Sequence, residues 1–251
     1  MNNNEEKIMR LQKYLSSAGV CSRRESEKYI EDGRVSINGR IAVLGDKVSS
    51  LDEVVFDEKR LSLCNKKYIV LNKPENVICS RKDERGRRTV FDLLKGDDKN
   101  DTSLFHIGRL DYNSCGLIIL TNDGDFANNI IHPSKSVVKG YLVTSQASLD
   151  VAKNIAASFT RGITVDGIFY KAKMCKIQRD GKQMLIELKE GKKREIREVY
   201  KHFACEIIKL ERIFIGNLRL KDLNILPGEY VSMTYDEIYN AVYNNGVNKC
   251  K

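Results

Sequence analysis

The sequence is poor in the residues that mark several classes of protein. Its 251 residues include three prolines and three histidines, and no two of its seven cysteines are two to four residues apart. So few prolines argue against long extended linkers, and the cysteine and histidine spacing does not indicate a metal centre. No run approaches the ~18 apolar residues of a membrane-spanning helix. The first residues are polar and lack the apolar core of a signal peptide. We therefore expect a cytoplasmic protein with free thiols, no metal and no membrane contact.

The sequence does have enough apolar residues for a core, and an excess of positive charge. Hydrophobic residues make up 41% of the chain, which argues against wholesale disorder. Lys and Arg number 43 against 34 Asp and Glu, a net charge of +9. That excess fits either ordinary solvated surfaces or a polyanionic partner such as nucleic acid, so its position along the chain must decide. The length allows one large domain or two smaller ones.

A compact basic module opens the chain. Residues 7–47 hold nine Lys and Arg against five Asp and Glu, a local net charge of +4. Apolar spacing predicts a helix that ends near Gly19, and Ser22-Arg23-Arg24-Glu25 has the capping-box pattern of a second helix start. Alternating apolar residues around Asn38-Gly39 predict a hairpin. The candidate phosphate contacts, which ordinary solvation would equally explain, are Arg10, Lys13, Arg23, Arg24, Lys28 and Arg34.

The order of these motifs resembles a known RNA-binding domain. Residues 11–24, followed by Asp32-Gly33-Arg34-Val35 and Ile37-Asn38-Gly39, are similar to the S-four-type domain found in a ribosomal protein and in several RNA-modifying enzymes. The resemblance implies RNA rather than DNA as the partner. We expect this domain to span residues 8–57.

A larger segment begins after the polar stretch at residues 57–67. Residues 68–71 predict a buried strand that stops at Asn72-Lys73-Pro74. Residues 82–88 form a charged, glycine-containing loop. Its arginines Arg85, Arg87 and Arg88 are candidates for contact with an RNA backbone, and a solvated loop is the alternative.

Two aspartates in residues 106–124 are candidates for chemistry. Asp123 precedes an apolar helical run, so we expect it to cap that helix. Asp111 follows Gly108-Arg109-Leu110 in a predicted loop, ahead of a buried strand at residues 117–120. Arg109 lies on the same face if that piece is extended. The residues alone leave open a structural Asp–Arg pair, a catalytic carboxylate, and a hydrolase that uses both aspartates.

The motif around Asp111 resembles the active-site signature of pseudouridine synthases. The matching residues are Gly108-Arg109-Leu110-Asp111, Gly116-Leu117 and Thr121-Asn122-Asp123-Gly124, and they are most similar to the RsuA/RluB type that acts on ribosomal RNA. Further landmarks follow the family order: Asn72-Lys73-Pro74, His132-Pro133-Ser134, Lys139-Gly140-Tyr141 and residues 190–197. The resemblance covers about residues 8–235.

The resemblance implies a fold and a set of site residues. The fold is α+β: a small helix-helix-hairpin RNA-binding domain, a catalytic domain with a mixed or antiparallel sheet at residues 67–240, and a polar tail at 241–251. By position, Asp111 matches the catalytic aspartate, Tyr141 the tyrosine that packs against the target base, and Arg197 the basic residue paired with the aspartate. Arg109 would help to position the loop or the flipped base. A monomer without cofactor is expected.

Two departures from the family pattern stand out. Asn76 occupies a position after Lys-Pro where glycine is common, and asparagine tolerates the left-handed conformation better than most residues. Glu195 and Glu198 stand where glutamine and arginine are usual, which affects the expected RNA contacts there.

The reaction implied is the conversion of uridine to pseudouridine in ribosomal RNA. The N1 glycosidic bond breaks, the uracil turns, and C5 bonds to C1′, after the nucleotide has flipped out of its stack. Whether Asp111 attacks the sugar, attacks the base or removes a sugar proton stays open. Spacing and the His132-Pro133-Ser134 motif favour large-subunit RNA. The alternatives are small-subunit RNA and a non-catalytic ribosome-assembly factor.

Overall fold

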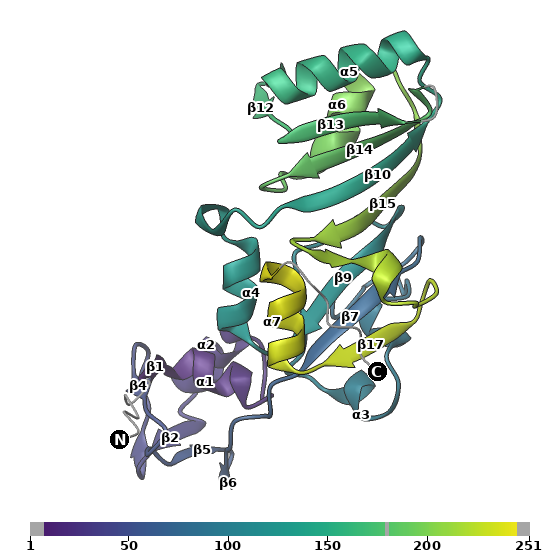
Figure 1. Ribbon diagram of the computed structural model, residues 1–251. Coiled ribbons are helices and arrows are strands. Elements are labelled where there is room, and N and C mark those ends of the chain that lie inside the picture. The colour runs from purple at the N-terminus through teal and green to yellow at the C-terminus, as the bar shows by residue number, and fades with distance from the viewer. Residues whose placement is uncertain (1–7, 179–180, 245–251) are drawn as a thin grey trace. The chain divides into compact units, whose positions relative to one another are not determined.

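The computed structural model describes residues 8–178 and 181–244 (Figure 1). The protein is α+β and divides into two compact units. Unit 1 comprises the chain through Lys66 together with Gly96–Phe105, and unit 2 comprises Lys67–Lys95 and the chain from His106 onward. Within the described ranges, no helix is both long enough and apolar enough to cross a membrane.

Unit 1 is a small domain of short helices and strands. Its elements are β1 (Met9–Arg10), α1 (Leu11–Ser17), α2 (Arg23–Glu31), β2 (Val35–Ile37), β3 (Arg40–Ile41), β4 (Lys47–Val48), β5 (Val54–Phe56), β6 (Lys59–Arg60) and α3 (Gly96–Asn100). Four of the strands form a sheet in the order β3-β2-β5-β6. Leu11 and Leu15 of α1, Ile30 of α2, and Val35 and Val54 of the sheet share one buried core.

Local sequence signals explain how unit 1 begins its second helix and its hairpin. Ser22 caps α2 by accepting a hydrogen bond from the Glu25 backbone N–H at 3.3 Å. A capping box would also have the Glu25 carboxylate accept from the Ser22 backbone N–H. That carboxylate instead accepts from the Tyr29 hydroxyl at 3.4 Å. Asn38 and Gly39 have φ values of 50° and 80°, so the predicted two-residue turn between β2 and β3 is confirmed.

Unit 2 is built on a nine-stranded mixed sheet. Its path runs β13-β14-β10-β15-β9-β7-β17, with β16 paired to β15 and β8 to β9. The strands are β7 (Tyr68–Lys73), β8 (Phe105–Ile107), β9 (Ser114–Thr121), β10 (Lys139–Ser145), β13 (Met174–Gln178), β14 (Gln183–Leu188), β15 (Ile207–Ile215), β16 (Leu218–Arg219) and β17 (Tyr230–Met233). A separate hairpin joins β11 (Ile163–Val165) to β12 (Ile168–Tyr170). The main path is antiparallel except where β15 runs parallel to β9. The predicted mixed sheet is confirmed.

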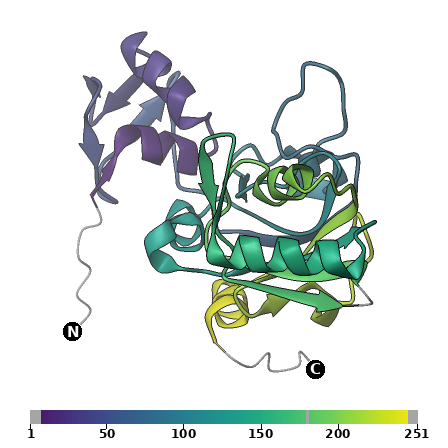
Figure 2. The same ribbon diagram turned by 90° about the horizontal axis from the view of Figure 1, so that it is seen from above.

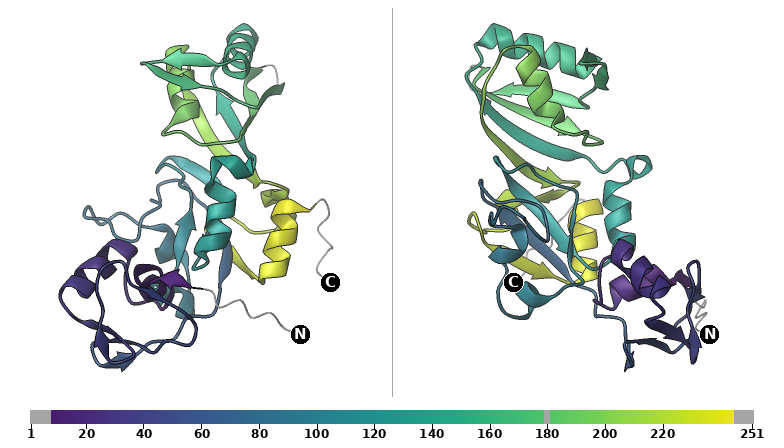
Figure 3. Two further views of the ribbon diagram at one scale, coloured as in Figure 1. Left: turned by 90° about the vertical axis from the view of Figure 1, so that its left-hand side faces the viewer. Right: turned by 180° about the vertical axis from the view of Figure 1, so that it is seen from behind.

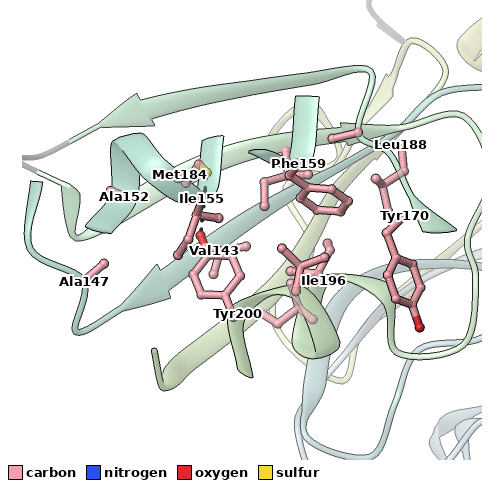
Figure 4. Close-up of a cluster of buried hydrophobic side chains, with 14 of the residues drawn as sticks. Val143, Ala147, Ala152, Ile155, Phe159, Tyr170, Met184, Leu188, Ile196 and Tyr200 are labelled. Carbon is pink, nitrogen blue, oxygen red and sulfur yellow. Dashed lines mark hydrogen bonds between the residues drawn. The ribbon is translucent and has the colours of Figure 1, made fainter. Parts of the chain in front are cut away.

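The helices of unit 2 pack against two halves of this sheet. They are α4 (Gly124–Ile131), α5 (Leu149–Arg161), α6 (Glu195–His202) and α7 (Tyr235–Tyr243), with 3-10 turns at Val90–Leu93, Pro133–Lys135 and Leu220–Asp222. Helices α5 and α6 share a core with β10 and β14, in which Phe159 and Tyr200 are buried (Figures 2 and 4). Helices α4 and α7 meet beside β7 (Figure 3), where the Phe126 ring lies 5.2 Å from Tyr68 and 6.2 Å from Tyr235.

A glycine allows the two halves of the sheet to join. At the parallel junction, Gly116 of β9 lies opposite Arg212 of β15. Gly116 has a φ of +99°, and a Cβ added there would lie 2.3 Å from the carbonyl oxygen of Arg212. The position therefore requires glycine for both its backbone conformation and its close contact.

Helix α7 continues into the segment that we expected to be a polar tail. Ala241 and Val242 are 7% and 2% exposed, so their burial extends the helix through Tyr243. Residues 245–251 of that tail, with Cys250, lie outside the described residues. The six other cysteines are free thiols, as expected.

Candidate active site

The structure pairs Asp111 with Arg197. Asp111 lies in the loop between β8 and β9, and Arg197 projects from α6, with its Nε 3.6 Å from Oδ2 of the aspartate. The Nη2 of Arg197 donates to the Asn113 carbonyl and to the Ser114 hydroxyl, both at 3.0 Å. Burial lowers the pKa of Arg197, an effect opposed by the charge of Asp111. One guanidinium thus binds both the carboxylate and the loop that carries it.

The four residues of unit 2 that we expected to act on or bind the target uridine line the same cleft. The cleft has a volume of about 100 Å³, and Arg109, Asp111, Tyr141 and Arg197 contribute to its wall. The Asp111 side chain is 39% exposed, so a ligand in the cleft can reach it. Tyr141 stands on β10, where it pairs with Ile186 and with Arg212 on the neighbouring strands. The loop, the strand and the helix together bring a carboxylate, an aromatic ring and two guanidinium groups to one small hollow.

Lys73 supports the loop that carries Asp111, a role that sequence reasoning did not assign. Its side chain is buried, and Nζ donates to the carbonyl oxygens of Pro74 at 2.9 Å and Ser114 at 2.7 Å. Desolvation lowers the pKa of this ammonium group, against the raising effect of nearby anionic groups that include Asp111. The Asn72-Lys73-Pro74 motif was the available signal, but it does not reveal which distant carbonyls the lysine reaches.

Asn76 and Glu195 show how the structure accommodates the two departures from the family pattern. Asn76 has a φ of 61°, the left-handed conformation expected of it, and its backbone N–H donates to the Tyr112 carbonyl at 2.9 Å. Glu195 is buried, and its carboxylate accepts from the Lys192 backbone N–H at 3.1 Å. Burial raises the pKa of Glu195. Glu198 forms an ion pair with Arg194 at 3.4 Å. Both glutamates thus stabilise the start of α6.

The basic loop at residues 82–88 lies next to the loop that carries Asp111. Arg87 forms an ion pair with Asp83 at 2.7 Å, and its guanidinium carbon lies 5.8 Å from the ring centroid of Tyr112, the residue after Asp111. Arg87 therefore shapes the loop. Arg85 and Arg88 are exposed and accessible to a polyanion.

The remaining candidate RNA contacts belong to unit 1. Arg23, Arg24 and Lys28 are exposed along α2, Arg10 is exposed in β1, and Lys13 is partly buried in α1. Arg34 is engaged within the unit: its guanidinium lies 4.3 Å from the Tyr29 ring centroid and 4.9 Å from that of Phe56. The guanidinium also donates to both carboxylate oxygens of Asp57, which raises the pKa of Arg34. Arg34 therefore has a structural role that competes with phosphate binding.

Asp123 is a helix cap. Its Oδ1 accepts from the backbone N–H groups of Asp125 and Phe126 at 3.0 and 3.2 Å, and its Oδ2 accepts from the Tyr68 hydroxyl at 2.8 Å. One oxygen is committed to the start of α4 and the other to Tyr68 of β7, so the capping prediction is confirmed and a hydrolase that uses Asp123 is disfavoured. No group of three or more His, Cys, Asp or Glu able to hold a metal is found in the part of the chain that the structure describes.

Comparison with protein families defines the class of protein. The model for "RNA pseudouridylate synthase" matches residues 67–204, and the model for the S4 domain matches residues 9–54. The fold and site are thus those of an RNA-modifying isomerase with an S4 domain before its catalytic domain. The chain belongs to the RNA pseudouridylate synthase family.

Individual relatives agree with this family. An uncharacterized RNA pseudouridine synthase of Borreliella burgdorferi is 40% identical over 86% of this chain and 87% of its own. Ribosomal large subunit pseudouridine synthase B of Bacillus subtilis is 33% identical over 91% and 93%. Dual-specificity RNA pseudouridine synthase RluF of Escherichia coli K12 is 36% identical over 92% and 77%. A crystal structure of a pseudouridylate synthase superposes with a TM-score of 0.66 at 28% identity, over 93% of this chain and 100% of that one.

Proposed function

We propose that this protein isomerises a specific uridine of large-subunit ribosomal RNA to pseudouridine, with Asp111 as the catalytic residue. The ion pair between Asp111 and Arg197 in the wall of the cleft carries the proposal. The target RNA is supported by the similarity to the Bacillus subtilis large-subunit enzyme. We further propose that the protein acts as a cytoplasmic monomer without cofactor.

The geometry assigns a role to each of the four cleft residues. A flipped uridine enters the cleft and packs against the Tyr141 ring, in the way that unstacked bases pack on aromatic side chains. The Asp111 carboxylate acts on the nucleotide while Arg197 holds its orientation. Arg109, exposed at the cleft, contacts the flipped nucleotide or its phosphate. The N1–C1′ bond breaks, a C5–C1′ bond forms, C5 loses its proton and N1 gains one, directly or through solvent, so product and substrate have the same atoms.

The basic side chains outside the cleft bind the rest of the RNA in this proposal. Arg10, Lys13, Arg23, Arg24 and Lys28 supply an electrostatic anchor in unit 1, and neutralised phosphates release their counterions. In unit 2, Arg85 and Arg88 contact the backbone beside the target. Arg34 and Arg87 contribute through the local structures that they stabilise.

Pseudouridine formation by Asp111→Asn tests the assignment. Ribosomal RNA transcripts are incubated with wild type, with Asp111→Asn, and with Asp150→Asn, which alters a carboxylate that is 92% exposed and outside the cleft. We expect a mass-silent, carbodiimide-reactive uridine with wild type and Asp150→Asn, and none with Asp111→Asn, although that variant still binds RNA. Normal turnover by folded Asp111→Asn would exclude Asp111 as the catalytic residue.

Mapping the pseudouridines of ribosomal RNA decides which subunit RNA the protein modifies. Pseudouridines are compared in ribosomal RNA from cells with and without this gene. Loss of a site in large-subunit RNA is the expected result, and loss of a small-subunit site would overturn the proposed target. A wild-type protein that binds RNA and modifies no uridine would instead favour an assembly factor.

A further inference from the structure

A second, larger hollow in unit 2 shares a wall segment with the active-site cleft. It has a volume of about 640 Å³ and is lined by Thr160, Lys171, Ala172, Lys173, Lys189 and Glu190. The segment between β14 and α6 contributes to both hollows. Leu188, Gly191 and Lys192 line the active-site cleft, whereas Lys189 and Glu190 line the second hollow. Residues 188–192 thus form part of the wall of both hollows.

The second hollow carries excess positive charge. Three of its lining residues are lysines and one is acidic. Lys173 is paired with Glu187 at 2.9 Å, and Glu190 with Lys192 at 3.4 Å. Lys171 and Lys189 have no ion pair among residues 8–178 and 181–244, so both ammonium groups can serve an anionic ligand. A polyanion gains most from such charges because it releases counterions on binding.

An exposed aromatic ring lies next to these lysines. Phe169, two residues before Lys171, is 51% exposed. Its ring packs against Gly162, where an added Cβ would fall 2.3 Å from the ring. Lys192 donates to the Phe169 carbonyl at 2.7 Å, which ties this strand to the loop before α6. Strand β12 and that loop lie at the same end of unit 2 (Figure 1). Aromatic rings beside basic groups are the usual means of binding single-stranded nucleic acid.

Glu195 holds the two lysine-bearing segments together. Its buried carboxylate accepts hydrogen bonds from the backbone N–H groups of Lys192 and Lys171. Lys171 is thereby attached to the start of α6, which also carries Arg197. The hollow and the catalytic pair consequently belong to one rigid arrangement.

We propose that the second hollow binds the RNA strand that continues from the flipped uridine. Lys171 and Lys189 bind its phosphates, and one base of the strand stacks on Phe169. This proposal rests on the proposed function, because it takes the strand from the active-site cleft. It adds a subsite for flanking nucleotides to the cleft that accepts the uridine.

Binding of long and short RNA tests the subsite. The full-length double variant Lys171→Gln/Lys189→Gln is compared with wild type and with Lys201→Gln/Lys221→Gln, which alters two exposed lysines outside both hollows. The probes are a large-subunit RNA fragment that contains the mapped uridine, and the same fragment trimmed to a few nucleotides. On the long RNA we expect about tenfold weaker binding by the first variant. Its slope of log Kd against log salt should fall by roughly 1.4, since each single-strand phosphate contact contributes about 0.7.

Three controls make the result decisive. On the trimmed RNA, the first variant and wild type should bind equally, and kcat at saturating long RNA should be unchanged. Phe169→Ala should also weaken binding to the long RNA alone, by about fivefold or more. Unchanged affinity and salt slope on the long RNA, or an equal loss on both RNAs, would overturn the subsite. If wild type forms no pseudouridine, the proposed function fails, and the same binding comparison on a long oligouridylate and a uridine trinucleotide still decides the subsite.

Discussion

Lys73 and Arg197, which lie on different elements, both bind Ser114 at the start of β9. The Nζ of Lys73 on β7 donates to the Ser114 carbonyl at 2.7 Å, and Nη2 of Arg197 on α6 donates to the Ser114 hydroxyl at 3.0 Å. Ser114 follows Asp111 by three residues, so both cations restrict the position of the carboxylate. The chain just after Asp111 is thus held by two side chains that lie 124 positions apart in the sequence, Lys73 and Arg197.

Replacing Lys73 with methionine should weaken both the fold and the activity. The variant leaves carbonyls near the catalytic loop without their donor, which costs about 1–3 kcal/mol of unfolding free energy. Loss of loop position should lower kcat at least tenfold, roughly 1.4 kcal/mol in barrier. Urea unfolding and single-turnover kinetics measure the two effects, with exposed Lys221→Met as the control. Wild-type kcat in folded Lys73→Met would contradict a positioning role.

Arg197 should tolerate lysine poorly. A guanidinium contacts Asp111, the Asn113 carbonyl and the Ser114 hydroxyl at once, whereas an ammonium is a point charge that lacks this planar fork. We expect Arg197→Lys to lose about tenfold in kcat and Arg197→Met about a hundredfold or more, roughly 1.4 and 2.7 kcal/mol in barrier. RNA affinity should change little. Equal kcat for Arg197→Lys and Arg197→Met would contradict this order, because it would show that a positive charge alone, without the guanidinium hydrogen bonds, contributes nothing to kcat.

Gly116→Ala should disrupt the sheet far more than a glycine substitution in open space. Gly116 has a positive φ, and a Cβ added there would lie 2.3 Å from the Arg212 carbonyl oxygen, whereas Gly167 has a φ of +77° and nothing within 4 Å of an added Cβ. Gly167→Ala therefore measures conformational strain alone, about 1–2 kcal/mol. Gly116→Ala should cost about 3 kcal/mol or more, since the clash adds to that strain. Urea midpoints compare the two, and similar losses would show that the junction yields easily.

Lys139 should make stability depend on pH in the alkaline range. Burial, with a smaller effect from Arg212, lowers the pKa of Lys139 from 10.5 to about 8. Between these two values the unfolded chain binds more protons at this site than the folded chain, so rising pH favours folding. The unfolding free energy of wild type relative to Lys139→Met should therefore rise by about 1–2 kcal/mol from about pH 7 to about pH 10. A difference that stays flat or falls would contradict this sign.

Two kinds of arginine in unit 1 should respond differently to substitution. Arg34 stacks on Tyr29 and Phe56 and binds Asp57, so Arg34→Gln should lower the free energy of unfolding. Arg23 and Arg24 are exposed at the start of α2. Arg23→Gln/Arg24→Gln should keep wild-type stability but bind RNA less tightly, with a shallower salt dependence. Chemical unfolding and RNA titrations at several salt concentrations separate the two. A stability loss in the double variant without any change in RNA binding would reverse the assignment.

Features that depend on near neighbours in sequence were predictable. The Asn38-Gly39 turn, the Asp123 cap and the left-handed Asn76 each follow from the conformational or hydrogen-bonding preference of one residue. The absence of a hydrogen bond from the Ser22 backbone N–H to Glu25 was not predictable, because the Tyr29 hydroxyl one turn later offers the carboxylate another donor. The extension of α7 depends on burial of Ala241 and Val242, which a polar local composition conceals.

Contacts between distant segments explain what sequence reasoning missed at the site. Resemblance to a family placed Asp111, Arg109, Tyr141 and Arg197 together, and the structure brings all four to one cleft. The residues that support them were not predicted. Lys73 reaches a carbonyl 41 residues away, a pairing that no spacing rule contains. Arg34 likewise binds Asp57, which is 23 residues away, and this contact competes with phosphate binding.

The parallel junction at Gly116 makes the active site sensitive to mechanical shear. Asp111 precedes β9 on one side of this junction, whereas Tyr141 lies on β10, which pairs with β15 on the other. The register of β9 against β15 therefore contributes to the separation between the Asp111 carboxylate and the Tyr141 ring. A shift of one half of the sheet past the other would therefore move Asp111 relative to Tyr141. The pairing of β9 with β15 thus stabilises the sheet and also positions Asp111 relative to Tyr141.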